Sequence, residues 1–367
     1  MTLDPDLLVQ GPRGRRLCLE YALACAHRSG TQAGTDAATT VFWAAREYDG
    51  EAGGTVVFIR SGPDGDQDLS QPAGRTAADA SAALDTIPVA VPTAAELRDA
   101  LAMSVDTAMY WQPPDGADRL CAAGQMTAAL RRVAAVIAAA PDAQWWAEPV
   151  ATDDQWSVPW DGDGRMPDDV HADLRLWRER TLADDSRAAA ERPEDPRAAW
   201  SGAWWSMPPN GLVHTTRALG ADGPAGLWFV EDSLGWEAAV ATPVDTSPAR
   251  VIEIDGAEDW AQLCRRHPLE VTASRRHDWY RVTDRDGTWV IPDWTTVALE
   301  ADGVHLTVRG YLAAATRLID LGDGRASVLA GWGPDVTYWF RGVSPRPVDA
   351  QQWSREADGW SRGGPPT

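Results

Sequence analysis

The sequence of 367 residues contains no lysine, so all 33 of its basic side chains are arginine. This absence excludes mechanisms that need a side-chain amine, such as a P-loop lysine, a Schiff base to pyridoxal phosphate or a kinase-type lysine. Asparagine is almost absent too, with Asn210 its one occurrence. The lack of lysine and the single asparagine indicate a genome rich in G and C, as in many bacteria, because the codons for both residues are AT-rich.

Cysteine is scarce as well, with four copies. Cys18 and Cys25 lie on one face of a predicted helix, whereas Cys121 and Cys264 stand alone and no CxxC motif occurs. A disulfide framework or a zinc knuckle needs closer clustering, so we expect four unpaired cysteines in the core. The histidines show no metal-ligand spacing, and we expect no metal site.

Long apolar segments are missing. No apolar run approaches the roughly 20 residues that a membrane-spanning helix needs. The first residues, MTLDPDLLVQ, lack both the basic and the apolar parts of a secretory signal. We therefore expect a cytoplasmic protein that does not associate with membranes.

Positive charge is outweighed by negative charge. The chain has 54 acidic residues against 33 arginines, which gives a net charge of −21 at pH 7. Such a surface repels nucleic-acid phosphates and anionic lipid. Duplex nucleic acid is therefore not an expected partner, and a nucleotide-like small molecule or a protein remains.

The pattern along the chain predicts an α+β protein with two domains, in agreement with its length. Residues 1–141 read as a mainly helical domain with a small hairpin, and residues 142–199 as an acidic connector with one helix. Residues 200–345 read as an α+β domain with an antiparallel or mixed sheet. The composition of residues 346–367 predicts a flexible tail.

Local signals place the N-terminal elements. Apolar periodicity predicts helices over 12–30, 93–108 and 126–140, the second of which starts with a Thr93/Glu96 capping box. Two β-branched and aromatic runs, 39–46 and 54–60, predict the strands of the hairpin.

The C-terminal half contains short strand-like runs separated by short helices. The runs are GLVHTT, GLWFVE, RVIEI, TWVIP, VHLTV, ASVLAGW and VTYWF. Helices are predicted to start near Asp259, Asp293 and Gly310. Asp followed by Trp occurs at 259/260, 278/279 and 293/294, which suits a helix N-cap followed by an aromatic anchor.

Tryptophan is abundant, with twenty copies, nineteen of them from Trp111 onward. Most are interpreted as core anchors, because each buries a large area. A few are expected to line a pocket, and we select Trp228, Trp236 and Trp279 because of their neighbours. A Trp-rich surface that recognises a protein partner is an alternative.

One segment, residues 265–281, is distinctly basic. It contains five arginines, among them the pair Arg275 and Arg276, against only Glu270 and Asp278. Paired guanidinium groups match the oxygens of phosphate or carboxylate. The segment therefore predicts either an anion-binding site or a set of intramolecular ion pairs with the surplus acids.

Two motifs in the C-terminal half carry a resemblance. Residues 212–217, LVHTTR, read as a strand ending in hydroxyls, and GLWFVEDSLGWEAA follows with a central aromatic run and a polar turn. Their order resembles that of ADP-ribosyltransferases of the H-Y-[E] type. In that family a strand-borne His and a following hydroxyl hold the nicotinamide ribose, and a later aromatic segment before a Ser-containing helix stacks on nicotinamide.

The resemblance implies NAD as substrate and assigns roles. His214 and Thr216 would hold the ribose and amide, Trp228 or Phe229 would lie against the ring, and Ser233 would belong to the following helix. The pair Arg275–Arg276 would take the pyrophosphate.

The family also needs a carboxylate to stabilise the oxocarbenium-like centre as the N-glycosidic bond breaks. It lies on a late strand in the family, yet no Glu occurs here between Glu300 and Glu356. The resemblance therefore implies that Asp335, or else Glu231 or Asp232, supplies the charge.

Three functions are compatible with these features. The first is an NAD-binding ADP-ribosyltransferase-like enzyme or a degenerate relative. The second is a non-enzymatic module that binds a protein through a Trp-rich surface. The third is a carbohydrate- or nucleoside-processing enzyme that uses Trp stacking and an Asp/Glu pair.

Overall fold

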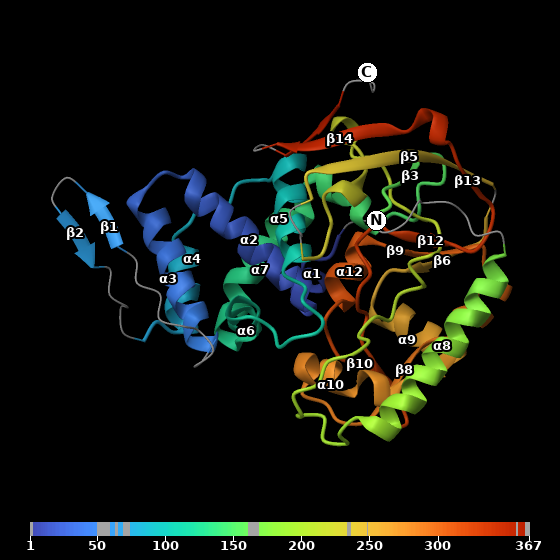
Figure 1. Cartoon of the computed structure of the whole chain (residues 1–367). Helices are drawn as coiled ribbons and strands as arrows, with labels where there is room; N and C mark the ends of the chain where they lie inside the picture. The colour runs from blue at the N-terminus through green and yellow to red at the C-terminus, as the bar shows by residue number, and fades with distance from the viewer. Residues whose placement is uncertain are drawn as a thin grey trace. The chain divides into compact units, whose positions relative to one another are not determined.

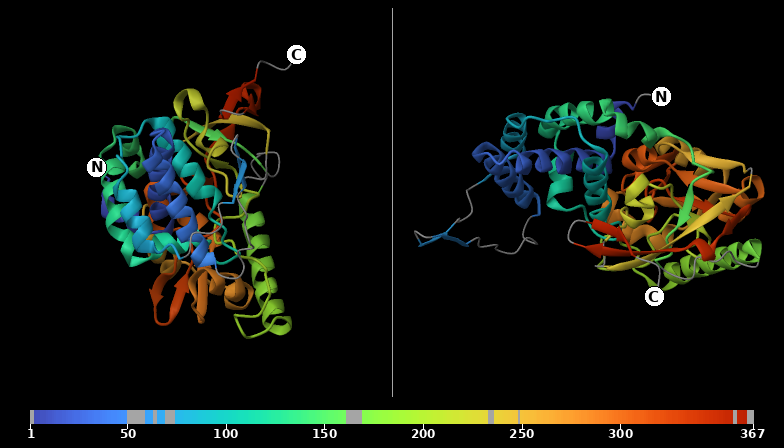
Figure 2. Two further views of the ribbon diagram at one scale, coloured as in Figure 1. Left: turned by 90° about the vertical axis from the view of Figure 1, so that its left-hand side faces the viewer. Right: turned by 90° about the horizontal axis from the view of Figure 1, so that it is seen from above.

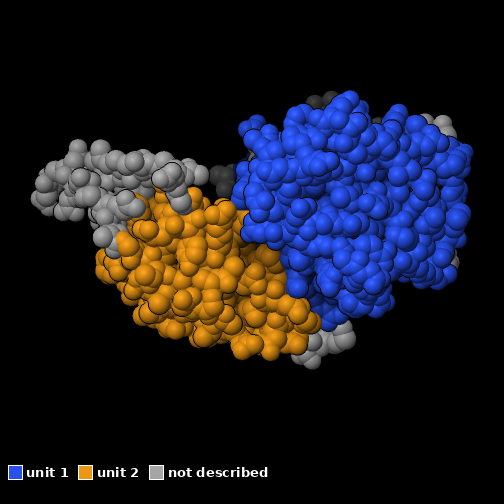
Figure 3. All heavy atoms as spheres, turned by 90° about the horizontal axis from the view of Figure 1, so that it is seen from below, with its two compact units in different colours: residues 1, 101–113, 144–367 blue, residues 2–100, 114–143 orange. Residues whose placement is uncertain are grey.

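The computed structural model describes residues 3–49, 59–62, 65–68, 74–160, 169–232, 236–247, 249–356 and 359–363 (Figure 1). The chain divides into two compact units (Figure 3). Unit 1 comprises Leu101–Pro113 and Gln144–Thr367, and unit 2 comprises Thr2–Ala100 and Pro114–Ala143. The fold is α+β, as predicted, with a helical N-terminal region and mixed and antiparallel sheets in the C-terminal region.

Unit 2 is built from helices. They are α1 (Pro5–Gln10), α2 (Pro12–Arg28), α3 (Gln32–Asp49), α4 (Ala77–Asp85), α6 (Gly116–Ala122) and α7 (Thr127–Ala139), with a 3-10 turn η2 (Gly124–Met126). Helix α5 (Ala94–Asp106) begins in unit 2 and ends in unit 1. One hairpin pairs β1 (Ile59–Gly62) with β2 (Gly65–Asp68).

The predicted helix signals of this region are confirmed. The Thr93 backbone N–H donates to Glu96, and the Glu96 N–H donates to the Thr93 hydroxyl, so the capping box forms. All four cysteines of the chain are buried and unpaired.

The strand predicted over 39–46 is wrong, because these residues lie inside α3. The buried positions of α3 include Ala37, Val41 and Ala44, a helical spacing that outweighs the β-branched composition of the run 39–46.

Unit 1 contains the sheets. Its helices are α8 (Val170–Glu191), α9 (Ala257–Arg266), α10 (Thr272–Thr283), α11 (Trp294–Glu300) and α12 (Val308–Ala314). Its strands are β3 (Gln155–Ser157), β4 (His214–Thr215), β5 (Ala238–Thr246), β6 (Val251–Ile254), β7 (Pro268–Glu270), β8 (Thr288–Pro292), β9 (Gly303–Leu306), β10 (Ile319–Gly322), β11 (Arg325–Ser327), β12 (Thr337–Trp339), β13 (Val343–Pro345), β14 (Gln351–Glu356) and β15 (Gly359–Arg362). Short 3-10 turns are η3 (Pro141–Ala147), which begins at the boundary between the units, η4 (Gly220–Asp222), η5 (Ala225–Leu227) and η6 (Pro347–Asp349).

The strands form three sheets. One has the order β4-β12-β9-β6, in which β6 and β9 are parallel, and a second has the order β10-β11-β8-β7. In the third, β5 pairs with β3, β13 and β14, and β14 pairs with β15. Helix α9 packs against β6 of the first sheet and β8 of the second. The long helix α8 lies along the outside of unit 1 in both views of Figure 2 and contacts α10 and α11.

Tryptophan dominates the core of unit 1, as expected for most of the twenty. Trp260, Trp294 and Trp332 are fully buried and meet at centroid distances of 5.9 to 6.2 Å. A second cluster joins Trp279 and Trp289 to Tyr110 and Ala108. The segment Leu101–Pro113 therefore contributes to the core of the C-terminal half.

Several C-terminal predictions differ from the structure. GLWFVE (226–231) is not a strand, because η5 and irregular backbone replace it, and β5 begins where a helix was expected. Pro224 and two nearby glycines favour such a bend over an extended run. Asp293 does cap its helix, whereas Asp259 lies within the first turn of α9 and Asp278 lies in mid-α10.

The expected connector and the expected tail both contain regular secondary structure. Within 142–199, β3 joins the sheet of β5, and α8 is the predicted helix. Within 346–367, where we expected a flexible tail, β14 and β15 pair with each other and β14 pairs with β5.

The part of the chain that the structure describes has no single helix long and apolar enough to cross a bilayer. One bent pair, α6 with Gly124–Ala139, meets that test by length and composition, with a bend of 72° between its parts.

Candidate functional site, an aromatic cavity in unit 1

Unit 1 contains a cavity of about 450 Å³ whose walls are mainly aromatic. Its aromatic lining comes from Tyr110, Trp111, Trp156, Trp160, Trp204, Trp205, Phe229, Trp236, Tyr311, Trp332 and Tyr338. Its polar lining includes Asn210, His214, Thr215, Thr216, Glu231 and Asp232. An apolar pocket with a few converging polar groups is the usual form of a small-molecule site.

One wall is a stack of rings from two distant segments. The rings of Tyr110 and Trp204 are stacked with centroids 5.6 Å apart, and Trp204 lies 5.0 Å from Trp111 and 4.6 Å from Trp205. The Trp279 indole N–H donates to the Trp204 carbonyl at 2.9 Å and fixes the backbone of this segment. The wall is therefore anchored on the core cluster of Trp279 and Trp289.

A second wall is built around Trp160. Its ring meets Trp236 edge-on at 4.3 Å, and its indole N–H donates to the Gly226 carbonyl at 3.2 Å. The neighbouring Trp156 donates from its indole N–H to Asp154 at 2.9 Å. Because both N–H groups already have partners in the protein, these indoles offer a ligand their ring surfaces and need no hydrogen bond from it.

A third wall comes from the sheet of β4 and β12. The antiparallel register pairs His214 with Tyr338, and their rings lie 5.4 Å apart. Trp332 meets Tyr338 edge-on at 5.4 Å and donates to the Val336 carbonyl at 3.0 Å. The half-buried His214 imidazole is thereby presented against an aromatic background.

Two threonines tie this strand to its neighbours. The Thr216 hydroxyl accepts from the Gly226 N–H at 2.9 Å, which joins β4 to the segment that carries Phe229 and Glu231. The Thr215 hydroxyl accepts from the Trp339 indole at 2.7 Å and donates to the Gln155 side-chain carbonyl. The strand end and the 226–232 segment thus form one unit of the cavity wall.

The structure brings together six of the residues that the sequence singled out. His214, Thr216, Phe229 and Glu231 all line the aromatic cavity, and so does Asp232. Trp236, one of the three tryptophans selected as pocket residues, lines it too.

Other predicted residues lie elsewhere. Trp228 does not line the cavity. Its indole N–H donates to the Asp222 carbonyl at 2.8 Å, and its ring packs against a cluster that includes Trp353 and Trp360. Trp279 is fully buried in the core. Ser233 lies outside the described residues.

Sequence reasoning missed most of the cavity tryptophans. Trp204 and Trp205 are consecutive and precede Ser-Met-Pro-Pro, and a proline pair keeps a segment out of a regular sheet. Adjacent side chains point in different directions, so Trp204 and Trp205 could not both pack on the same face of a sheet. This adjacency was the sequence signal that one of them lies outside the core. Among the described tryptophans, Trp200 and Trp205 are the exposed ones.

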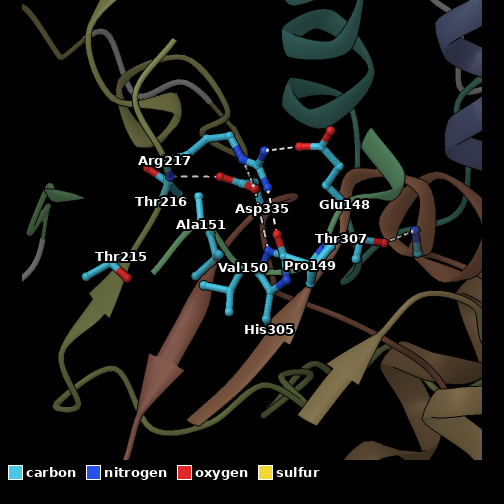
Figure 4. Close-up of polar contacts among 12 residues, drawn as sticks. Glu148, Pro149, Val150, Ala151, Thr215, Thr216, Arg217, His305, Thr307 and Asp335 are labelled. Carbon is cyan, nitrogen blue, oxygen red and sulfur yellow. Dashed lines mark hydrogen bonds and ion pairs between the residues drawn. The ribbon is translucent and has the colours of Figure 1, made fainter. Parts of the chain in front are cut away.

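Asp335 does not line the cavity but lies in a buried charge network (Figure 4). Its carboxylate accepts from the Arg217 N–H and from Arg217 Nε, both at 2.8 Å. The Arg217 guanidinium also donates to Glu148 and to the Pro149 carbonyl, and stacks over Trp145 at 4.7 Å. This carboxylate is therefore neutralised by a salt bridge.

The network continues through His305 on β9. His305 Nε2 lies 3.5 Å from Asp335, and Nδ1 lies 2.5 Å from Glu253 on β6. Burial lowers the pKa of His305, but the two carboxylates outweigh it and raise the pKa above its ordinary value. Glu253 also accepts from the Val150 N–H at 3.1 Å. The network joins β6 and β9 to the segment after β4, the segment before β12 and the segment before β3.

The arginines of the basic segment, residues 265–281, have different partners in the structure. Arg265, Arg266 and Arg281 form ion pairs with Glu258, Glu300 and Asp278. Arg276 donates to the Glu194 carbonyl at 3.3 Å. Arg275 is buried and lines a second cavity of about 470 Å³ in unit 1.

Comparison with known proteins adds no relative. The chain matches no protein-family model, no curated protein and no solved structure. Within the residues described above, no three or more His, Cys, Asp or Glu side chains are placed to hold a metal ion.

Proposed function

We propose that the aromatic cavity binds a small molecule through a flat ring, and that this ring is the nicotinamide end of NAD. The observation that carries the proposal is the meeting of His214, Thr216, Phe229 and Glu231 in one aromatic cavity. These residues come from two motifs that resemble ADP-ribosyltransferases. The volume of about 450 Å³ falls within the usual range for ligand sites, about 300–1,000 Å³.

The composition of the cavity suits a positively charged ring in particular. Aromatic faces attract cations through their quadrupoles. Glu231 and Asp232 add carboxylates to the same lining. Nicotinamide in NAD is a pyridinium, so both features stabilise the bound ring.

Cleavage of the N-glycosidic bond would then follow from these residues. The bond between ribose carbon and nicotinamide nitrogen breaks with its electron pair moving to the nitrogen, which leaves neutral nicotinamide and a positive charge on the ribose. Glu231 is the carboxylate that we assign to that developing charge. Asp335 is unsuited to this task, because it does not line the cavity and already pairs with Arg217.

A thermal-unfolding titration with nicotinamide and with NAD tests the binding. At 100 times Kd the ligand should stabilise the protein by about 2.7 kcal/mol. Trp236→Ala and Glu231→Gln should weaken binding, whereas Trp228→Phe, outside the cavity, should leave it unchanged. Glu231→Gln should also abolish release of nicotinamide from NAD. Stabilisation that is equal in all variants, or absent in the wild type, would contradict the proposal.

A carbohydrate- or nucleoside-processing enzyme is the second candidate. The adjacent carboxylates Glu231 and Asp232 beside tryptophan faces favour it, because such faces stack on sugar rings. Including sugars and nucleosides in the same titration separates the two. A response to these ligands without one to nicotinamide would select the second candidate.

We also infer a cytoplasmic setting. The four buried, unpaired cysteines support this inference, because disulfides are rare in reducing compartments. Thiol titration in denaturant should give the same four thiols with and without reductant.

A further inference from the structure

Arg275 on α10 is a buried cation with only neutral partners. Its residue is 5% exposed. Its Nε donates to the Trp205 carbonyl at 3.3 Å and its Nη1 to the Ser274 hydroxyl at 2.9 Å. Nη2 donates none of the hydrogen bonds found among the described residues. This guanidinium therefore has hydrogen-bonding capacity left on the side of Nη2.

Arg275 also has no carboxylate within ion-pair distance in the described part of the chain, unlike Arg265, Arg266 and Arg281 nearby. Burial lowers the pKa of Arg275 to about 10, against the opposing effect of the more distant Asp184 and Asp185. An uncompensated buried charge is strongly unfavourable. A bound anion would remove that cost.

The space for an anion is the cavity of about 470 Å³ that Arg275 lines. Arg180, an exposed residue of α8, lines the same cavity and makes no hydrogen bond or ion pair with any described residue. Two acids, Asp173 and Asp184, also line it, and Asp184 already pairs with Arg187 and Arg192. Two arginines thus remain without a carboxylate partner at one cavity.

This second cavity adjoins the aromatic one. Trp205 and Met207 line both, so the two spaces are separated by a single segment of chain in the same unit. Arg275 bonds the carbonyl of Trp205 in that segment. A ligand with its ring in one cavity and an anionic group in the other would contact this shared segment.

We propose that the cavity beside Arg275 and Arg180 binds a phosphate or pyrophosphate group. The two guanidinium groups supply forked N–H donors that match phosphate oxygens. The further step, that this phosphate belongs to the ligand whose ring enters the aromatic cavity, rests on the proposed function. The ligand class is then a nucleotide.

Calorimetric titration of the full chain with inorganic pyrophosphate tests the anion site by itself. Arg180→Gln and Arg275→Gln should each weaken binding about tenfold or more, because each removes a charge-assisted hydrogen bond. Arg276→Gln is the matched control, since Arg276 is the neighbour on α10 and bonds Glu194. It should bind pyrophosphate as the wild type does.

The exposed Arg180 keeps the test decisive if Arg275→Gln fails to fold. Unchanged binding in Arg180→Gln, or no saturable binding to the wild type, would overturn the proposal. Displacement of pyrophosphate by succinate at equal concentration would overturn the assignment to phosphate in favour of carboxylate.

Two further ligands separate this proposal from the proposed function. Nicotinamide should bind Arg180→Gln and the wild type equally, whereas the gain in affinity from nicotinamide to nicotinamide mononucleotide should be lost in the variant. Pyrophosphate binding without any nicotinamide binding would refute the ring assignment and leave the anion site standing. Loss of nicotinamide binding in Arg180→Gln would refute the separation into two subsites.

Discussion

At the scale of single residues, the carboxylate of Asp335 is tightly constrained. Asp335 is 2% exposed and has a positive φ of 62°, which is uncommon for a residue other than glycine. It holds Arg217, which follows the cavity threonines, and is followed by Val336 of the cavity wall. We interpret Asp335 as a positioning residue that fixes two wall segments.

Asp335→Asn should destabilise the protein by about 3–5 kcal/mol, because it leaves the buried Arg217 guanidinium with the exposed Glu148 as its one acidic partner among the described residues. Denaturant unfolding measures this change. The control is Asp245→Asn, whose ion pair with Arg346 is exposed and should contribute less than about 1 kcal/mol. Equal losses in the two variants would show that the buried network contributes nothing special.

His305 adds a pH dependence whose sign follows from its raised pKa. A pKa higher in the folded state gives a stability contribution that is complete below the unfolded value of about 6.5. That contribution is lost as the pH rises through the folded pKa. The charged groups facing the imidazole are Glu253 on β6 and Asp335, which is itself paired with Arg217.

The difference in unfolding free energy between the wild type and His305→Gln should therefore shrink as the pH rises above about 6.5. Denaturant titrations over a series of pH values measure it. His267 and His277, whose pKa values burial lowers, are present in both proteins and cancel in the difference. A difference that grows with pH would contradict a raised pKa for His305.

At the scale of elements, the cavity depends on a close approach between two loops. Gly331 has a φ of 78°, and a Cβ there would lie 2.7 Å from both Met207 Sδ and Trp205 Cδ1. The segment before β12 therefore packs directly on the segment that separates the two cavities. Only a residue without a side chain fits at this point.

Gly331→Ala should cost about 2–5 kcal/mol, as the sum of backbone strain and overpacking. It should also weaken nicotinamide binding, because Trp205 must move. Gly322→Ala is the matched control: its φ is 80°, and a Cβ at that position would have no atom within 4 Å. It should show the strain alone, about 1–2 kcal/mol, with unchanged binding.

Elements with local signals could be predicted from the sequence. Helices with apolar periodicity, such as α2, α5 and α7, lie where expected, and α5 also has its predicted capping box. The strand predicted over 226–231 was wrong because its apolar residues are buried by side chains from other segments, among them Val158 and Trp353. They do not form one buried face of a strand. The strands β14 and β15 carry few apolar residues, so their pairing with β5 had no signal.

At the scale of the whole molecule, the site shows the limit of sequence reasoning. The motifs identified His214, Thr216, Phe229 and Glu231, which lie within about one strand and its following loop. The other aromatic residues of the cavity come from distant parts of the sequence that the fold of unit 1 brings together, and no local pattern predicts this. They include Tyr110, Trp156, Trp204 and Trp332. Asp335 was noticed as an acid beside a late strand, but its salt bridge to Arg217 depends on the same tertiary contacts.

The charge of the whole chain leads to a last prediction. A net charge of −21 at pH 7 makes the folded state repel itself, because folding concentrates the like charges. Raising the salt concentration shortens the Debye length from about 30 Å at 0.01 M to about 10 Å at 0.1 M. The melting temperature at pH 7 should therefore rise with sodium chloride over this range.

Two comparisons identify the cause of such a rise. Near pH 5 the carboxylates begin to take up protons, so the net charge falls and the salt effect should be smaller. The loss caused by Asp335→Asn should stay nearly constant with salt, because a buried pair is screened little. A salt effect as large at pH 5 as at pH 7 would mean that salt acts through apolar burial, and that the surplus of acids over arginines does not limit stability.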